Sequence, residues 1–472
     1  MHPQDLAEYA VEQARSLGAS YCEARAESTI ASSFMLKNGV PELAGFQQRT
    51  GIGIRLHVDG ILGFISTNDF SRNKIAEMLE RSVRGIRATA RLHERVSLSA
   101  ERAHRKRYSV RAKRKPFDLS TEEKVGYLLE SEKRLASLGI DLPGRYFSLS
   151  DSMTEEYLVT SEGTRILARV PRVAFDYYLT IKAPNGKTMQ RYWNHGNAGG
   201  YEFVDGWDIP TMLEKEARTS VHMLTAGVKP PKGRLDLVTG PQVTGIMVHE
   251  SCGHPLEADR IFGREAAQAG ESFVDVGMIG KRIGSPCVTI VDDPTVEHGF
   301  GFYLYDNEGV KARRKVLMKK GVINEFLHNR ATAATMGIPS NGSSRATDFD
   351  KESIVRMSNT FMLPGKYSEE ELIEGVRKGV LMRNFMEWNI DDKRLNQRYV
   401  GAEAYLIENG RVTVPVLHPV LEITTPALYS SIEAVGNNLE CHAGSCGKGE
   451  PMQGIPVWLG GPSVRLCGVR LG

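Results

Sequence analysis

The sequence feature that most constrains the fold is the stretch Val-His-Glu-Ser-Cys-Gly-His-Pro at 248–255, which places two imidazoles around one carboxylate in a helix-like run. The two histidines are five residues apart. Five steps of about 100° turn the second side chain roughly 140° from the first, so a regular α-helix cannot direct both at one ion. Pro255 clashes with the carbonyl four residues earlier, and Gly253 relaxes the backbone. The sequence therefore predicts a π-type bulge or a helix break at 251–253.

This arrangement is similar to the helix of common metalloproteases, in which two histidines bind zinc and the glutamate beside the first acts as general base. By this comparison His249 and His254 are candidate zinc ligands, and Glu250 is the candidate base. The alternative is that both are ordinary partly buried histidines that form hydrogen bonds. A zinc site also needs a third protein ligand.

The third ligand has to come from a cysteine or histidine within or downstream of the motif. The candidates are Cys252, Cys287, Cys441, His442, Cys446 and Cys467. Cys446 lies in a glycine-rich, flexible segment at 444–449 that could bring a thiolate to a distant helix, and Lys448 would help to lower the pKa of that thiol. The pair Cys441-His442 is the alternative, and Cys252 is expected in the core. Two imidazoles and one thiolate leave a fourth position for water, which is typical of catalytic zinc.

Composition excludes several classes of protein. Lys and Arg number 60 against 57 Asp and Glu, so neither nucleic acid nor an anionic membrane is expected as the main partner. Six scattered cysteines argue against a secreted disulfide framework and favour a reducing cytoplasm. A signal peptide pattern and an apolar run of about 18 residues are both missing, so we expect a soluble, cytoplasmic protein.

Periodicity predicts an α+β fold of several domains, which fits a length of 472 residues. Antiparallel sheets flanked by helices are expected in the N-terminal part, with one sheet in each of two α+β domains. The C-terminal domain should be mostly β and carry the short, distorted active-site helix. The predicted divisions are an N-terminal α+β domain at 1–90, a basic linker at 91–119, a central α+β domain at 120–228 and the C-terminal domain at 229–472.

Further motifs strengthen the interpretation of the histidine motif. They are Glu257-Ala258-Asp259, Val291-Asp292-Asp293-Pro294, Asp306-Asn307-Glu308-Gly309, Arg356-Met357-Ser358-Asn359-Thr360, Ala404-Tyr405-Leu406-Ile407-Glu408-Asn409-Gly410 and Cys446-Gly447-Lys448. With them the whole chain resembles the TldD/PmbA family of zinc metallopeptidases, also called modulator-of-gyrase proteins, and is most similar to the TldD-like catalytic member. The segment 389–398 departs from the family, which is commonly glycine-rich there.

The resemblance implies specific roles. His249, His254 and Cys446 would bind zinc, and Glu250 would act as general base on a zinc-activated water. The expected reaction is hydrolysis of unfolded or short peptides by a dimer, formed with a PmbA-like subunit or with a second copy of the chain.

Two points stay open in the sequence. Asn341, Arg345 and Asp292 are candidate contacts to the substrate. The competing function is a non-catalytic peptide-binding or regulatory protein with a structural zinc site. Glu250 discriminates between the two, because a structural site needs no carboxylate beside its first histidine and usually has four protein ligands.

Overall fold

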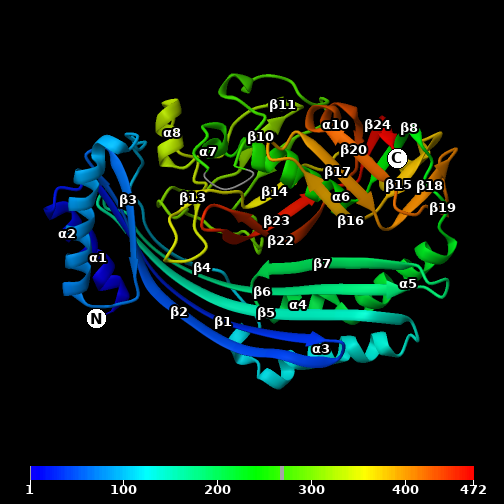
Figure 1. The fold of residues 1–472 in the computed structure, drawn as a ribbon, viewed down its shortest axis with the longest axis horizontal. Helices are drawn as coiled ribbons and strands as arrows, with labels where there is room; N and C mark the ends of the chain where they lie inside the picture. The colour runs from blue at the N-terminus through cyan, green and yellow to red at the C-terminus, as the bar shows by residue number, and fades with distance from the viewer. Residues whose placement is uncertain (1, 266–269) are drawn as a thin grey trace.

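A long, curved sheet forms the lower layer of the molecule, and the C-terminal part of the chain lies above it (Figure 1). The computed structural model describes residues 2–265 and 270–472. The strands of this seven-stranded sheet are β1 (Tyr21–Lys37), β2 (Val40–Val58), β3 (Ile61–Thr67), β4 (Arg105–Ser109), β5 (Asp141–Thr160), β6 (Arg165–Lys182) and β7 (Thr188–Ala198). Tight turns join its hairpins: Asn38 and Gly39, between β1 and β2, have φ values of 49° and 80°, as a hairpin turn of the primed types requires.

Helices cover one face of the sheet at two places. They are α1 (Pro3–Ser16) and α2 (Arg72–Thr89) at the N-terminal end, and α3 (Thr121–Ala136), α4 (Tyr201–Trp207) and α5 (Ile209–Ala226) at the other. The alternation along β6 shows why the two faces differ. Val173, Phe175 and Tyr177 are buried in the core, while the residues between them belong to the opposite face. That opposite face is turned toward the C-terminal part.

The C-terminal part contains two larger sheets and short helices. One sheet, in the order β11-β10-β9-β14-β23-β22, contains β9 (Ile290–Asp292), β10 (Lys315–Lys319), β11 (Val322–Ile323), β14 (Asn359–Met362), β22 (Glu440–Lys448) and β23 (Gln453–Gly461). The nine-stranded sheet contains β8 (Gly233–Thr239), β15 (Lys378–Met382), β16 (Phe385–Ile390), β17 (Asn396–Gly401), β18 (Ala404–Glu408), β19 (Arg411–Pro415), β20 (Val420–Thr424), β21 (Ile432–Val435) and β24 (Val464–Leu471). A small pair is formed by β12 (Ser344–Arg345) and β13 (Ile354–Val355).

The helices of this part are α6 (Pro241–Val248), α7 (Ala258–Ile261), α8 (Arg330–Met336), α9 (Glu369–Glu374) and α10 (Thr425–Ser431). The buried helix α6 packs against β14, β22 and β23. It follows β8 directly, because Pro241 begins the helix one residue after Gly240. The end of α6 is therefore held next to the edge strand β22.

The predicted α+β class is confirmed, with a mostly β C-terminal part. The prediction of one separate sheet in each of the first two domains is wrong, because β1 pairs with β5 from Glu23↔Thr160 to Lys37↔Tyr146 and joins them. The segment 91–119, expected to be a linker, contains β4, which pairs in parallel with β6. The basic residues of β4 are typical of an exposed edge strand. The domain boundaries stay predictions.

Within residues 2–265 and 270–472, no helix combines the length and the apolar character needed to cross a membrane.

Candidate metal centre

A π-helical turn carries the first histidine and the glutamate. It spans His249–Gly253 and continues α6, and a 3₁₀ turn at His254–Leu256 follows. The N–H of His254 donates to the carbonyl of His249, five residues earlier, so the wider turn returns the second histidine to the face of the first. A Cβ on Gly253 would overlap the sulfur of Met357, so a larger residue here would force the Met357 side chain or the turn to shift. The predicted bulge is confirmed.

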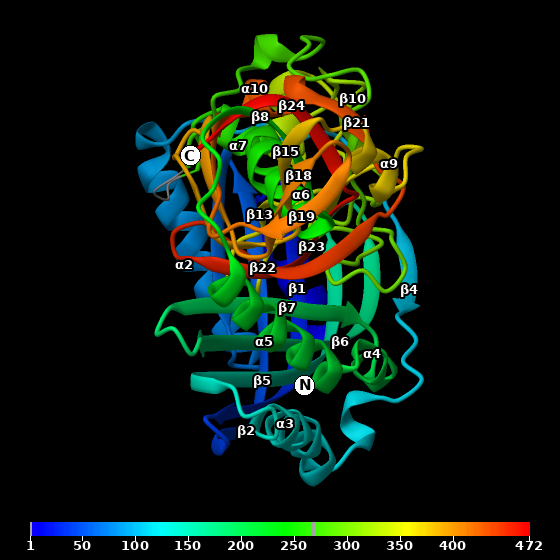
Figure 2. The same cartoon turned by 90° about the vertical axis from the view of Figure 1, so that its right-hand side faces the viewer.

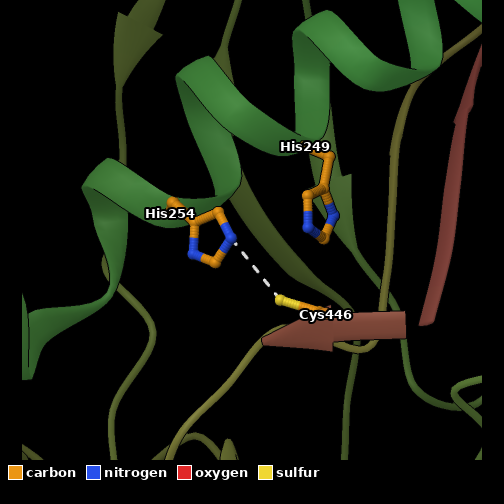
Figure 3. Close-up of side chains that lie close together, drawn as sticks. All are labelled: His249, His254 and Cys446. Carbon is orange, nitrogen blue, oxygen red and sulfur yellow. Dashed lines mark hydrogen bonds between the residues drawn. The ribbon is translucent and has the colours of Figure 1, made fainter. Parts of the chain in front are cut away.

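Three side chains meet beside this turn: His249, His254 and Cys446. Figure 3 shows both rings directed toward the thiol. Their nearest potential ligand atoms all lie within 4.8 Å of one another, and Cys446 Sγ is 3.4 Å from His254 Nε2. All three are buried, with exposed fractions of 3%, 3% and 4%. Cys446 lies on β22, so the segment predicted to be a flexible loop is a strand.

The donors fit a zinc ion in both chemistry and spacing. Zinc bonds of about 2.0–2.3 Å place neighbouring ligands of a tetrahedral site roughly 3.5 Å apart, close to the distance between Cys446 and His254. Burial lowers the pKa of both histidines, which favours the neutral imidazoles that bind metal. Burial raises the pKa of Cys446, but His254 and Arg356 outweigh it and lower the value to about 7. His249 Nδ1 has no hydrogen-bond partner among the described residues.

A buried ionic network orients His254. Its Nδ1 lies 2.9 Å from Glu257 Oε2, so Nε2 is the nitrogen directed at Cys446. Burial alone would raise the pKa of Glu257, but Lys448 and His254 hold it well below its ordinary value. Lys448 Nζ lies 2.7 and 2.8 Å from the two oxygens of Asp259. Lys448 therefore ties β22 to the helix side of the centre. The largest effects that lower the pKa of the Cys446 thiol come from His254 and Arg356.

The carboxylate of Glu250 faces an arginine. Arg394 Nη1 donates to Glu250 Oε2 over 2.7 Å, and the two side chains are 11% and 7% exposed. Arg394 lies in the turn between β16 and β17, with φ of 63°. This turn belongs to the segment 389–398 that departs from the family pattern. The contact could not be found from sequence, because no short motif links residues 144 positions apart.

A cavity of about 300 Å³ opens onto the centre. Its lining comes from β7, α6, the β16–β17 hairpin, β22 and β23. The residues around it are Tyr192, Trp193, Asn194, Ile246, His249, Glu250, His254, Phe385, Trp388, Arg394, Ala443, Gly444, Ser445, Cys446, Gly447, Val457 and Leu459. Aromatic walls and a few polar groups are typical of a ligand site.

The other candidate ligands lie elsewhere. The ring of His442 packs edge-on against Trp193, and burial lowers its pKa to about 3. Neither it nor Cys441 belongs to the three-residue group in the described part of the chain. Cys252 is buried in the core, as predicted, and burial raises the pKa of its thiol. Cys287 and Cys467 are exposed.

The three predicted substrate contacts do not line the cavity at the centre. Asp292, on β9, is fully buried and accepts hydrogen bonds from Ser358 and Thr360. Asn341 bonds to the backbone of 326–328. Arg345 donates to the carbonyls of Met357 and Pro456 and lines a different cavity.

Comparison with known proteins agrees with this geometry. Three family models match the chain: PmbA/TldA metallopeptidase domain 1 at 22–86, the central domain at 114–224 and the C-terminal domain at 232–472. A metalloprotease of Methanothermobacter thermautotrophicus is 32% identical over 96% of this chain and 95% of its own. A zinc metalloprotease TldD homolog of Saccharolobus solfataricus is 24% identical over 98% of each chain.

The same fold occurs in a solved structure, TldE from Thermococcus kodakarensis. It superposes with a TM-score of 0.76 at 16% identity and covers 99% of this chain and 100% of that one. The fold, the three family models and the archaeal relatives lead to one conclusion: the chain belongs to the TldD/PmbA family of zinc metallopeptidases.

Proposed function

We propose that the chain is a zinc-dependent peptidase that hydrolyses unfolded or short peptides. His249, His254 and Cys446 hold the metal, and Glu250 is the general base. The observation that carries this proposal is the meeting of Cys446 with both histidines, the nearer of which is 192 residues away in sequence, at a cavity that Glu250 also lines. A catalytic zinc site has three protein ligands and an open position, which this donor set and cavity match.

Residues of the chain itself transfer the proton of the attacking water. A zinc ion bound by the three side chains would lower the pKa of a water molecule and polarise the scissile carbonyl. Glu250 accepts a proton from the attacking water and returns it to the leaving amine. Arg394 Nη1, 2.7 Å from Glu250 Oε2, fixes the direction of the carboxylate. Glu257 holds His254 in the tautomer that leaves Nε2 free for the metal.

The strand β22 supports binding of an extended peptide. It pairs with β23 and, in the described residues, is the edge of its sheet, so it has no strand partner on its other side, although the carbonyl of Cys446 accepts a hydrogen bond from Arg356. A peptide paired along β22 passes Cys446 and the cavity. Backbone hydrogen bonds of this kind tolerate many sequences, whereas a buried centre excludes folded proteins.

The proposal extends to assembly and location. We expect a dimer, with a PmbA-like subunit or with a second copy, in the cytoplasm. The TldE structure is a relative with the same fold, which supports a partner of this type. The near balance of 60 basic and 57 acidic residues gives no support for nucleic acid or a membrane as the partner.

Glu250→Gln tests the catalytic assignment. The amide can still accept a hydrogen bond from Arg394 but cannot take a proton, so zinc content should stay at the wild-type level while the rate of peptide cleavage falls by about 100- to 10,000-fold. Metal analysis and a fluorogenic, unstructured peptide measure the two quantities. Glu422→Gln, at a side chain 73% exposed, is the matched control. Cleavage by Glu250→Gln at the wild-type rate would favour the alternative, a non-catalytic binding protein with a structural zinc.

A further inference from the structure

A second cavity continues from the one at the metal centre. It measures about 460 Å³ and lies between the concave face of the seven-stranded sheet and the C-terminal part. Figures 1 and 2 both show β22 lying along β7 at this junction, and the two strands are in contact. The two cavities share Asn194 of β7 and 443–445 of β22. A peptide that leaves the metal centre along β22 therefore enters this space.

The floor of the second cavity is the sheet face without helices. On β6 this face carries Arg172, Ala174 and Asp176, which alternate with buried core residues. Neighbouring strands contribute small polar side chains, including Ser33 and Ser150. These short side chains leave room for a peptide, and a charged side chain among them is accessible to it.

Most charged groups on this cavity already have partners. Glu27 pairs with Arg25 at 3.6 Å, Asp151 with Lys124 at 2.8 Å and Asp348 with Arg49 at 2.8 Å. Arg172 donates to the carbonyls of Phe300 and Phe302. His195 is uncharged near neutral pH, because burial lowers its pKa to about 4.

Asp176 is the exception. Its carboxylate forms no hydrogen bond and no ion pair with the described residues, although the residue is half-buried, and burial raises its pKa to about 6. At neutral pH the site thus contains a carboxylate with no protein counter-charge, a costly arrangement that a cation from outside would relieve.

We propose that the second cavity is a subsite for a cationic group of the bound peptide, and that Asp176 is the carboxylate that binds it. The inference rests on the proposed peptidase function. Two sources supply such a group: the side chain of a lysine or arginine within the peptide, and the ammonium of its N-terminus.

The distances place the proposed cationic subsite near the scissile bond of a bound peptide. Asp176 is directly opposite Asn194 in the β6–β7 pair, so their Cα atoms are about 4.5–5.5 Å apart, and Asn194 also lines the cavity of Cys446. An extended peptide advances about 3.3 Å per residue, so the cationic group lies only a few residues from the bond that is cut. Arg172 is four residues away on the same strand, about 13 Å, and does not cancel the charge of Asp176.

Equilibrium binding tests the proposal without depending on catalysis. The probes are labelled, unstructured peptides with an acetylated N-terminus. Each carries lysine, norleucine or glutamate at one position, and that position is moved along the peptide from one set to the next. A further pair without lysine differs only in a free or acetylated N-terminus. Binding to the full-length chain is followed by fluorescence anisotropy with a chelator present, so that no peptide is cut. We expect one lysine position, or the free N-terminus, to bind about tenfold more tightly than its neutral counterpart.

Variants assign the preference to Asp176. Asp176→Asn should remove the preference for the cationic peptide. Its affinity for the neutral peptide should stay unchanged, which shows that the site is still folded. Asp176→Lys should bind the glutamate peptide more tightly than the neutral one. Asp141→Asn, at an exposed pair with Lys182 on the same sheet, is the control and should keep the preference. Equal affinities of the wild type for all peptides, or a preference that persists in Asp176→Asn, would overturn the subsite. Absence of cleavage with zinc restored, while the preference stands, would instead count against the proposed peptidase function.

Discussion

At the scale of single residues, the side chains around the centre differ in how firmly they are held. His254 is fixed by Glu257, which in turn contacts Lys448 and Arg260 at 3.3 and 2.8 Å. His249 has no comparable partner among the described residues. An orienting carboxylate raises the basicity of the imidazole and preorganises the ring, so Glu257 should contribute to metal affinity without touching the ion.

Replacing Glu257 by Gln should weaken zinc binding about 10- to 100-fold, because the amide bears no charge to orient and polarise His254. Competition with a chromophoric chelator measures the dissociation constant. Glu422→Gln should bind zinc as the wild type does. An unchanged constant for Glu257→Gln would show that the Glu257 contact does not support the metal site.

At the scale of elements, the π turn is the part of the site that the sequence predicts best. The five-residue spacing, Gly253 and Pro255 are local signals, and they determine local backbone geometry. The strand β22 was not predictable in this way. Its glycines favour a loop by local preference, but pairing with β23 from Glu440↔Gly461 to Lys448↔Gln453 overrides that preference. Arg394 and Glu257 acquire their contacts only through packing, which no spacing in the sequence reveals.

The packing of the π turn against Met357 gives a test of this element. Gly253→Ala should lower the free energy of unfolding by about 1–3 kcal/mol, because the new Cβ overlaps the Met357 sulfur. Denaturant unfolding measures the change. Gly126→Ala, where a Cβ meets nothing within 4 Å, should not destabilise the protein. In a Met357→Ala background the glycine substitution should cost less, and an equal cost in both backgrounds would contradict the steric explanation.

At the scale of the whole molecule, the fold class follows from periodicity, but the joining of the sheets does not. Hairpin turns such as Asn38-Gly39 are visible in sequence, whereas the pairing of β1 with β5 joins segments more than a hundred residues apart. The same holds for the centre. The motif identifies His249, Glu250 and His254, but the place of Cys446 depends on β22 crossing beside the end of α6.

The central claim is that His249, His254 and Cys446 together hold a catalytic zinc. The most direct measurement combines the zinc content of the purified chain with its rate of cleavage of an unstructured peptide. Both are measured before a chelator is added, after it is added and after zinc is returned. Cys446→Ser is measured in the same way. We predict about one zinc per chain, loss of cleavage on chelation, recovery with zinc, and loss of both zinc and cleavage in Cys446→Ser. Wild-type zinc content in Cys446→Ser, or cleavage that persists without metal, would contradict the claim.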